Sequence, residues 1–260
     1  MNQETIMNNT MNNDLYTYIL RQADNSMILC QRLCEWVANA PELEEDIALT
    51  NIGLDLIGQA RALYQYAATM SDQDIDENDL VFMRDERDWS NALLVELPNG
   101  NFADTIARQF LFDAWHLAFL EQLIHSKDET LSAIAAKSVK ESRYHLRHSS
   151  NWVKRLGDGT QISHDRMQLA IDHIWHYIPE LFESDELDQR MLESGIGVNL
   201  EQVKHQWNAT VTNCLNKAAL RRPDDTVLMS GGRYGIHTEH MGFLLAEMQI
   251  LPRSMPDCQW

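Results

Sequence analysis

Acidic residues recur inside four apolar stretches of the chain, in the order in which a buried di-iron centre takes its ligands. In a four-helix bundle, such a centre uses one carboxylate from each of two helices and a Glu-x-x-His pair from each of the other two. Residues three apart lie on one face of a helix, so both side chains of a pair can bind the same metal ion. The corresponding positions here are Asp24, Asp55 with Gly58, Asp113, and Glu141 with Tyr144.

The residue types at these positions depart from the pattern that iron requires. Gly58 and Tyr144 stand where the two histidines belong, and neither glycine nor neutral tyrosine replaces a neutral imidazole as a ligand. Asp24, Asp55 and Asp113 are each one methylene shorter than glutamate. We therefore predict a degenerate site that binds no metal, in which the acids form a buried polar network that sets the register of the bundle.

A functional metal site stays open as an alternative, because histidines lie close to these acids in the sequence. His116 follows Asp113 by three residues, and His145 follows Glu141 by four. A di-iron oxidase built on this chain would use these four residues together with Asp55. Two more pairs have a metal-compatible His-x-x-His spacing without an evident third ligand: His173 with His176, and His237 with His240.

Residues 137–155 contain six basic side chains and one acid, in a chain whose net charge is −18. Lys140, Arg143 and Arg147 share one helix face. This stripe either docks an acidic partner or an anionic cofactor such as a CoA phosphate, or it pairs with acids of its own chain. A second polar segment, residues 84–91, either lines an interface or ligand cleft or is solvated; its candidate contact residues are Asp88, Trp89, Ser90 and Asn91.

Helices must position these residues, because the apolar side chains recur at helical spacing and only 11 Gly and 6 Pro interrupt 260 residues. We predict an all-α fold, a four-helix bundle with additional C-terminal helices, as a single domain over residues 14–260. Residues 1–13, rich in Asn and Thr, are predicted to be a disordered extension. The predicted helices cover residues 15–38, 46–68, 102–125 and 129–156 in the bundle, and 163–177, 185–193, 200–220 and 237–250 after it.

The bulk composition excludes several classes of protein. A net charge of −18 argues against a nucleic-acid partner, since phosphate binding needs a basic surface. There is no apolar run of 18 residues, so no membrane span is expected, and the N-terminus lacks the pattern of a signal peptide. The spacing of Cys30, Cys34, Cys214 and Cys258 fits neither a disulfide framework nor a zinc site, so we expect a cytoplasmic location.

Eight blocks of the sequence together resemble the family of C subunits of bacterial ring-1,2-phenylacetyl-CoA epoxidases. The resemblance extends over residues 16–260 and implies a ferritin-like fold. Family members belong to a multicomponent monooxygenase of phenylacetate catabolism, which adds one atom of O₂ to the aromatic ring of phenylacetyl-CoA. The blocks are PELEEDIALTNIGLDLIGQAR, RDERDWSN, LPNGNFADTIARQF, DAWH, KESRYHLRHSSNW, RLGDGT, IHTEH and LLAEMQ.

The resemblance also implies a role and a set of partners. Members of this family are the non-catalytic structural partners of the di-iron catalytic subunit of the epoxidase, and a separate reductase subunit supplies electrons through NADPH, flavin and an iron–sulfur centre. It implies no cofactor and no catalytic residue in this chain, and it places phenylacetyl-CoA in the complex. A homodimer, or a helical docking module of another complex, stays open as an alternative. The residues expected at an interface, or facing CoA, are Asp88, Trp89, Ser90, Asn91, Lys140, Arg143 and Arg147.

Overall fold

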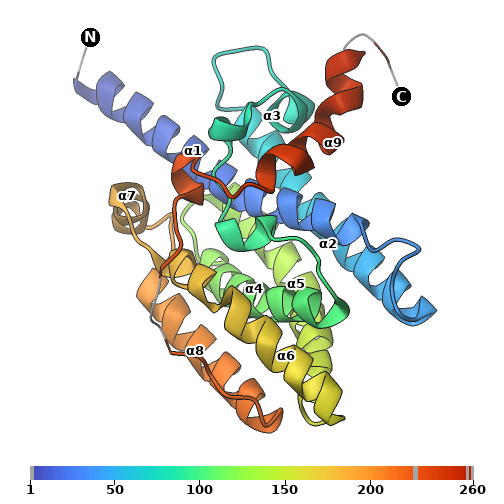
Figure 1. Cartoon of the computed structure of the whole chain (residues 1–260). Helices are drawn as coiled ribbons and strands as arrows, with labels where there is room; N and C mark the ends of the chain where they lie inside the picture. The colour runs from blue at the N-terminus through green and yellow to red at the C-terminus, as the bar shows by residue number, and fades with distance from the viewer. Residues whose placement is uncertain (1–2, 225–227, 256–257, 259–260) are drawn as a thin grey trace.

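The computed structural model describes residues 3–224, 228–255 and 258, and all regular secondary structure within them is helical (Figure 1). Five short 3-10 turns, at 86–88, 93–96, 175–177, 179–182 and 232–234, connect the longer elements. The α-helices are α1 (Gln3–Cys34), α2 (Leu43–Ala68), α3 (Glu77–Phe82), α4 (Phe102–Leu123), α5 (Glu129–Gly157), α6 (Gln161–Ile174), α7 (Glu186–Ser194), α8 (Leu200–Lys217) and α9 (Met241–Ser254).

Two helix pairs form the bundle. Helix α1 packs along α2, helix α4 packs along α5, and contacts between α2 and α5 join the pairs. Figure 1 shows α4 between the α1–α2 pair above and helices α6 and α8 below, both of which pack against it. Helices α3 and α9 lie together at the outer side of the α1–α2 pair. The prediction of an all-α, ferritin-like bundle with additional C-terminal helices is confirmed.

Helix α4 is the centre of the core. It is buried along nearly its whole length, with Phe110, Phe112 and Trp115 among its fully enclosed side chains. A capping box starts this helix: the Asn101 side chain accepts the Ala103 amide at 2.8 Å, and Asp104 accepts the Asn101 amide at 2.8 Å. Since α4 contacts α5, α6 and α8, polar groups on its surface are forced into the interior.

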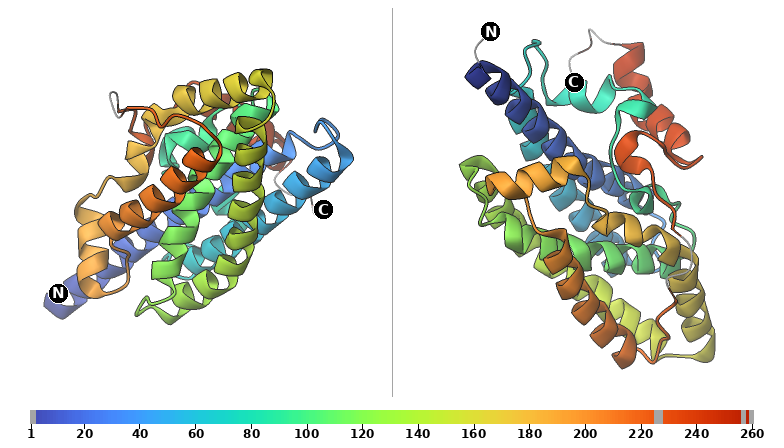
Figure 2. Two further views of the ribbon diagram at one scale, coloured as in Figure 1. Left: turned by 90° about the horizontal axis from the view of Figure 1, so that it is seen from below. Right: turned by 90° about the vertical axis from the view of Figure 1, so that its left-hand side faces the viewer.

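The first helix begins within the segment, residues 1–13, that was predicted to be a disordered extension. Helix α1 begins at Gln3, and its N-terminal end projects beyond the neighbouring helices in both views of Figure 2. The buried part of the helix starts near Leu15. Because no Gly or Pro interrupts the polar stretch before it, the helix can extend from there towards the N-terminus. Residues 1 and 2 lie outside the described part of the chain.

The last helix also differs from its prediction. It begins at Met241 rather than at His237, because His237 and Thr238 are bound by a buried carboxylate described below. It then continues through Pro252 to Ser254 instead of ending at residue 250. Among the described residues, none of the helices is both long and apolar enough to cross a membrane.

Candidate functional site

The polar residues at the bundle centre form pairs between facing helices. His145 Nε2 on α5 lies 3.0 Å from Asp55 Oδ2 on α2. One turn away, Gln59 Nε2 donates to Glu141 Oε2 at 2.9 Å. Burial lowers the pKa of His145 even though the Asp55 carboxylate opposes this effect, so the imidazole is neutral near pH 7. These contacts join α2 to α5 and use the acids as hydrogen-bond acceptors.

Asp113 on α4 has a different partner. Its Oδ2 accepts a hydrogen bond from Ser149 Oγ at 2.7 Å, and the side chain has no cation beside it. Burial raises the pKa of Asp113 to about 8, with Ser149 opposing the shift. Burial, together with the charge of His145, lowers the pKa of His116 to about 3. At neutral pH this part of the core therefore holds a protonated acid and a neutral imidazole.

Replacement of Asp113 by asparagine is expected to remove a pH dependence of stability. Because the pKa of Asp113 is raised from 3.8 to about 8 on folding, the folded state binds the extra proton between these values. The contribution of Asp113 to stability is then most favourable below pH 3.8 and is lost as the pH rises towards and through 8, by up to about 1.4 kcal/mol per pH unit. Urea unfolding between pH 5 and about 8 should show a flatter profile for Asp113→Asn than for the wild type. Parallel profiles would contradict this assignment.

Asp24 lies apart from the other acids. It binds both terminal nitrogens of Arg84 and accepts hydrogen bonds from Tyr64 Oη at 2.6 Å and from the Ser90 amide at 2.9 Å. Arg84 also stacks over the ring of Trp89, 4.3 Å from its centroid. Asp24 therefore anchors the segment that begins at Arg84 onto α1, and its charge is neutralised there by a guanidinium.

The structure divides the six degenerate positions into separate polar contacts rather than one continuous network. The two positions that would need histidines do not face the centre at all. Gly58 lines a surface hollow between α2 and α5, with no atom within 4 Å of an added Cβ. Tyr144 is 39% exposed and carries Arg147 over its ring. Within the described parts of the chain, no three His, Cys, Asp or Glu side chains gather in an arrangement that could hold a metal ion.

The structure divides the residues expected at an interface into three groups. Asp88, Lys140, Arg143 and Arg147 are exposed, and Arg143 forms an ion pair with Glu121 at 2.9 Å. Ser90 is half-buried because it binds Asp24. Trp89 and Asn91 are fully enclosed, so the prediction that they face a partner or CoA is wrong. The polar segment, residues 84–91, was expected to be accessible, but the contacts of Arg84 and Ser90 with Asp24 hold it against α1.

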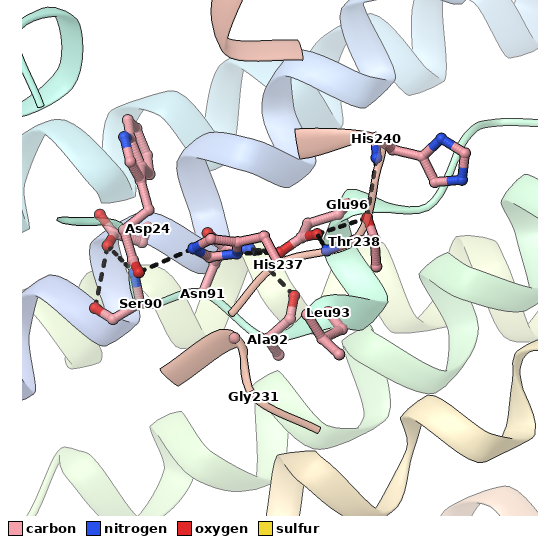
Figure 3. A network of polar contacts seen from close by, with 12 residues as sticks. Asp24, Ser90, Asn91, Ala92, Leu93, Glu96, Gly231, His237, Thr238 and His240 are labelled. Atoms are coloured by element: carbon pink, nitrogen blue, oxygen red, sulfur yellow. Dashed lines mark hydrogen bonds and ion pairs between the residues drawn. The ribbon is translucent and has the colours of Figure 1, made fainter. Parts of the chain in front are cut away.

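Sequence reasoning missed a fully buried carboxylate, Glu96, which joins the C-terminal segment to the core (Figure 3). Its side chain binds His237 Nδ1 at 2.6 Å, both the amide and the hydroxyl of Thr238, and Asn91 Nδ2. The other ring nitrogen of His237 lies 3.1 Å from the Trp89 carbonyl oxygen. Burial lowers the pKa of His237, but the hydrogen bond and charge of Glu96 outweigh this and raise it. His237 and Glu96 therefore form a buried ion pair.

A second buried acid, Glu180, binds three backbone amides: Leu93 at 2.7 Å, Gly231 at 2.8 Å and Gly232 at 2.9 Å. Burial raises its pKa, and these amides oppose the shift. Both missed acids stand alone within apolar runs, LLVEL and IPELF, which is the one sequence signal that could have revealed them. Their partners lie too far away in the sequence to be predicted.

Helix α2 also has an exposed apolar stripe that sequence reasoning missed. Leu43, Ile47, Leu54 and Ile57 lie on its outward face at helical spacing. The helix was expected to bury one stripe, and it does, but this second stripe has no cover within the described part of the chain. Ile57 of this stripe lines a hollow with Met27 and Val81, while Tyr144 and the exposed basic residues lie on α5, the helix that α2 contacts.

Comparison with known proteins places the chain in a family. The whole chain, residues 1–260, matches the model of a family described as phenylacetic acid catabolic protein. A curated relative from Escherichia coli (strain K12), the C subunit of 1,2-phenylacetyl-CoA epoxidase, is 52% identical over 248 residues. That alignment covers 95% of this chain and 100% of the relative.

Proposed function

The chain belongs to the phenylacetic acid catabolic protein family, and we propose that it is the non-catalytic structural subunit of a 1,2-phenylacetyl-CoA epoxidase. The observation that carries this proposal is the chemistry of the bundle centre. Every acid at the four carboxylate positions already has a protein partner: Arg84 for Asp24, His145 for Asp55, Ser149 for Asp113, and Gln59 for Glu141.

The donor set at the centre does not fit a di-iron site. Each of the four acids is bound to another side chain, and Gly58 and Tyr144 lie outside the interior. Iron would need the hydrogen bond between Asp55 and His145 to break, and it would need an ionised Asp113, although burial raises the pKa of that group to about 8. In this proposal the chain binds no cofactor, and iron belongs to the di-iron catalytic subunit. NADPH, flavin and the iron–sulfur centre belong to the reductase.

The proposed docking surface for the catalytic subunit lies across the α2–α5 junction. We define it by the apolar stripe of α2 and the exposed side chains of α5, namely Leu43, Ile47, Leu54, Ile57, Lys140, Arg143, Tyr144 and Arg147. Apolar side chains beside tyrosine and arginine are typical of the interior of protein interfaces. The basic charges on an otherwise acidic chain also favour an acidic partner surface.

Reversal of two charges on this surface should weaken assembly. We expect Arg143→Glu combined with Arg147→Glu to raise the Kd for the catalytic subunit by at least about tenfold. The new glutamates would face an acidic partner surface, and like charges that face each other across an interface cost several kcal/mol. Thermal unfolding should change little, because both side chains are exposed. Calorimetric titration of the catalytic subunit with each variant measures the change.

A matched control is Lys204→Glu with Lys217→Glu, which reverses two exposed charges on α8, outside this surface. This variant should bind the catalytic subunit with wild-type affinity, and equal losses in both double variants would contradict the proposed surface.

The same preparations serve for iron analysis after loading with Fe(II) and desalting. Well below one iron per chain supports the structural role, whereas a value approaching about two would favour the di-iron oxidase.

A further inference from the structure

A cleft of about 570 Å³ opens between the start of α4, the end of α6 and the start of α9. Its apolar wall consists of Leu97, Leu169 and Ile174. Its polar wall includes Arg108, His173 and His240, which come from three different elements. The cleft lies away from the α2–α5 junction, and its size is typical of small-molecule sites.

Arg108 is a fully buried cation that forms no ion pair with any carboxylate among the described residues. Its Nη1 donates to the Leu97 carbonyl oxygen and its Nη2 to Asn99 Oδ1 at 2.7 Å, while Nε has no partner. Among the described residues, the other buried arginines, Arg21 and Arg32, each have an acid within ion-pair distance, Asp185 and Glu35 respectively. Burial, and then the charge of Arg32, lowers the pKa of Arg108 to about 9. A desolvated cation of this kind gains most from an anion.

Two histidines also line the cleft. His173 and His240 belong to the two His-x-x-His pairs of the sequence, and the fold brings one member of each pair to the same cleft. No third His, Cys, Asp or Glu among the described residues completes a metal site with them. The carboxylate in the lining, Asp104, already accepts the Asn101 amide at 2.8 Å.

We propose that this cleft binds a small organic anion, whose carboxylate or phosphate group lies at Arg108 and whose hydrocarbon or aromatic body packs against Leu97, Leu169 and Ile174. A guanidinium binds either anion through its planar set of donors. This site is separate from the proposed docking surface, so binding by the isolated chain does not depend on assembly.

Calorimetric titration of the full chain with phenylacetate, phenyl phosphate and neutral phenylacetamide tests the proposal. At least one of the two anions should bind with a Kd between about 10 μM and 1 mM, and the amide at least about tenfold more weakly. The anion that binds more tightly identifies the group that the cleft prefers. Absence of binding for both anions up to about 10 mM, or equal affinity for the amide, would overturn the proposal.

Two substitutions on α6 locate the binding event. Leu169 is 70% exposed and lines the cleft, whereas Ile162 is 68% exposed and does not. Leu169→Glu should weaken anion binding at least about tenfold through repulsion and loss of the apolar wall, and Ile162→Glu should leave it within about twofold. Both variants should fold, since neither side chain is buried. Equal affinity in the two variants would place the anion elsewhere and refute the site.

Discussion

Replacement of Glu96 by alanine should lower the free energy of unfolding by about 3–5 kcal/mol, because it leaves a buried imidazolium without its counter-charge. Glu96 and the side chain of His237 are both fully enclosed, 2.6 Å apart. The substitution also removes the acceptor for the amide and hydroxyl of Thr238 and for Asn91. Urea unfolding followed by circular dichroism measures the loss, and we expect the C-terminal segment to detach first.

The pH dependence of the Glu96 effect is a second readout. The pKa of His237 is raised above its ordinary value of 6.5, so the contribution of the pair is present in full below that pH and is lost as the pH rises through the raised value. Alanine at position 96 should therefore cost more at pH 6 than at about pH 9. The matched control, Glu247→Ala on the exposed face of α9, should change stability by less than about 0.5 kcal/mol. Similar losses at positions 96 and 247 would show that the buried pair does not stabilise the fold.

Replacement of Asp24 by asparagine should also cost about 3–5 kcal/mol, because the guanidinium of Arg84 would stay buried without a charge partner. Burial lowers the pKa of Arg84, but Asp24 outweighs this effect and raises it, so the arginine stays charged and needs its partner. The same substitution at Asp55 is the matched control. Asp55 is 36% exposed and faces a neutral imidazole, so Asp55→Asn should cost less than about 1 kcal/mol.

The double variant Asp24→Asn with Arg84→Met separates the pair from the surrounding packing. Removal of both charges should recover part of the stability that Asp24→Asn loses, since an apolar replacement for a buried ion pair is often close to neutral. Urea midpoints of the four proteins form a double-mutant cycle. If the double variant is as unstable as the sum of the two single variants, the two side chains do not act as a pair.

Asp24 and Glu96 show how much of the buried polar pairing can be predicted from the sequence. Asp24 was found because an acid within an apolar helical stretch stands out, but its role was misassigned. Its partner Arg84 is 60 residues away, in a segment that reads as a solvated loop. Glu96 was missed because its partners at 237 and 238 are about 140 residues away. Local patterns report which side chains are buried more readily than they report their partners.

The sequence by itself determined the helices, the all-α bundle and the absence of histidines at two ligand positions. Each of these depends on local information: apolar residues at helical spacing, the capping residue Asn101, and the residue types Gly58 and Tyr144. The start of α1 at Gln3 is also consistent with local information, because no Gly or Pro separates the polar segment from the buried part of the helix.

Only the tertiary structure decided how the polar residues are paired. It separated Asp24 from the other acids, enclosed Trp89 and Asn91, joined Glu96 to His237, and brought His173 and His240 to one cleft with Arg108. The physical reason is that a hydrogen bond or ion pair depends on distances of about 3 Å between atoms on different elements. Helix periodicity sets the face on which a side chain lies, and the packing of helices sets what that side chain meets.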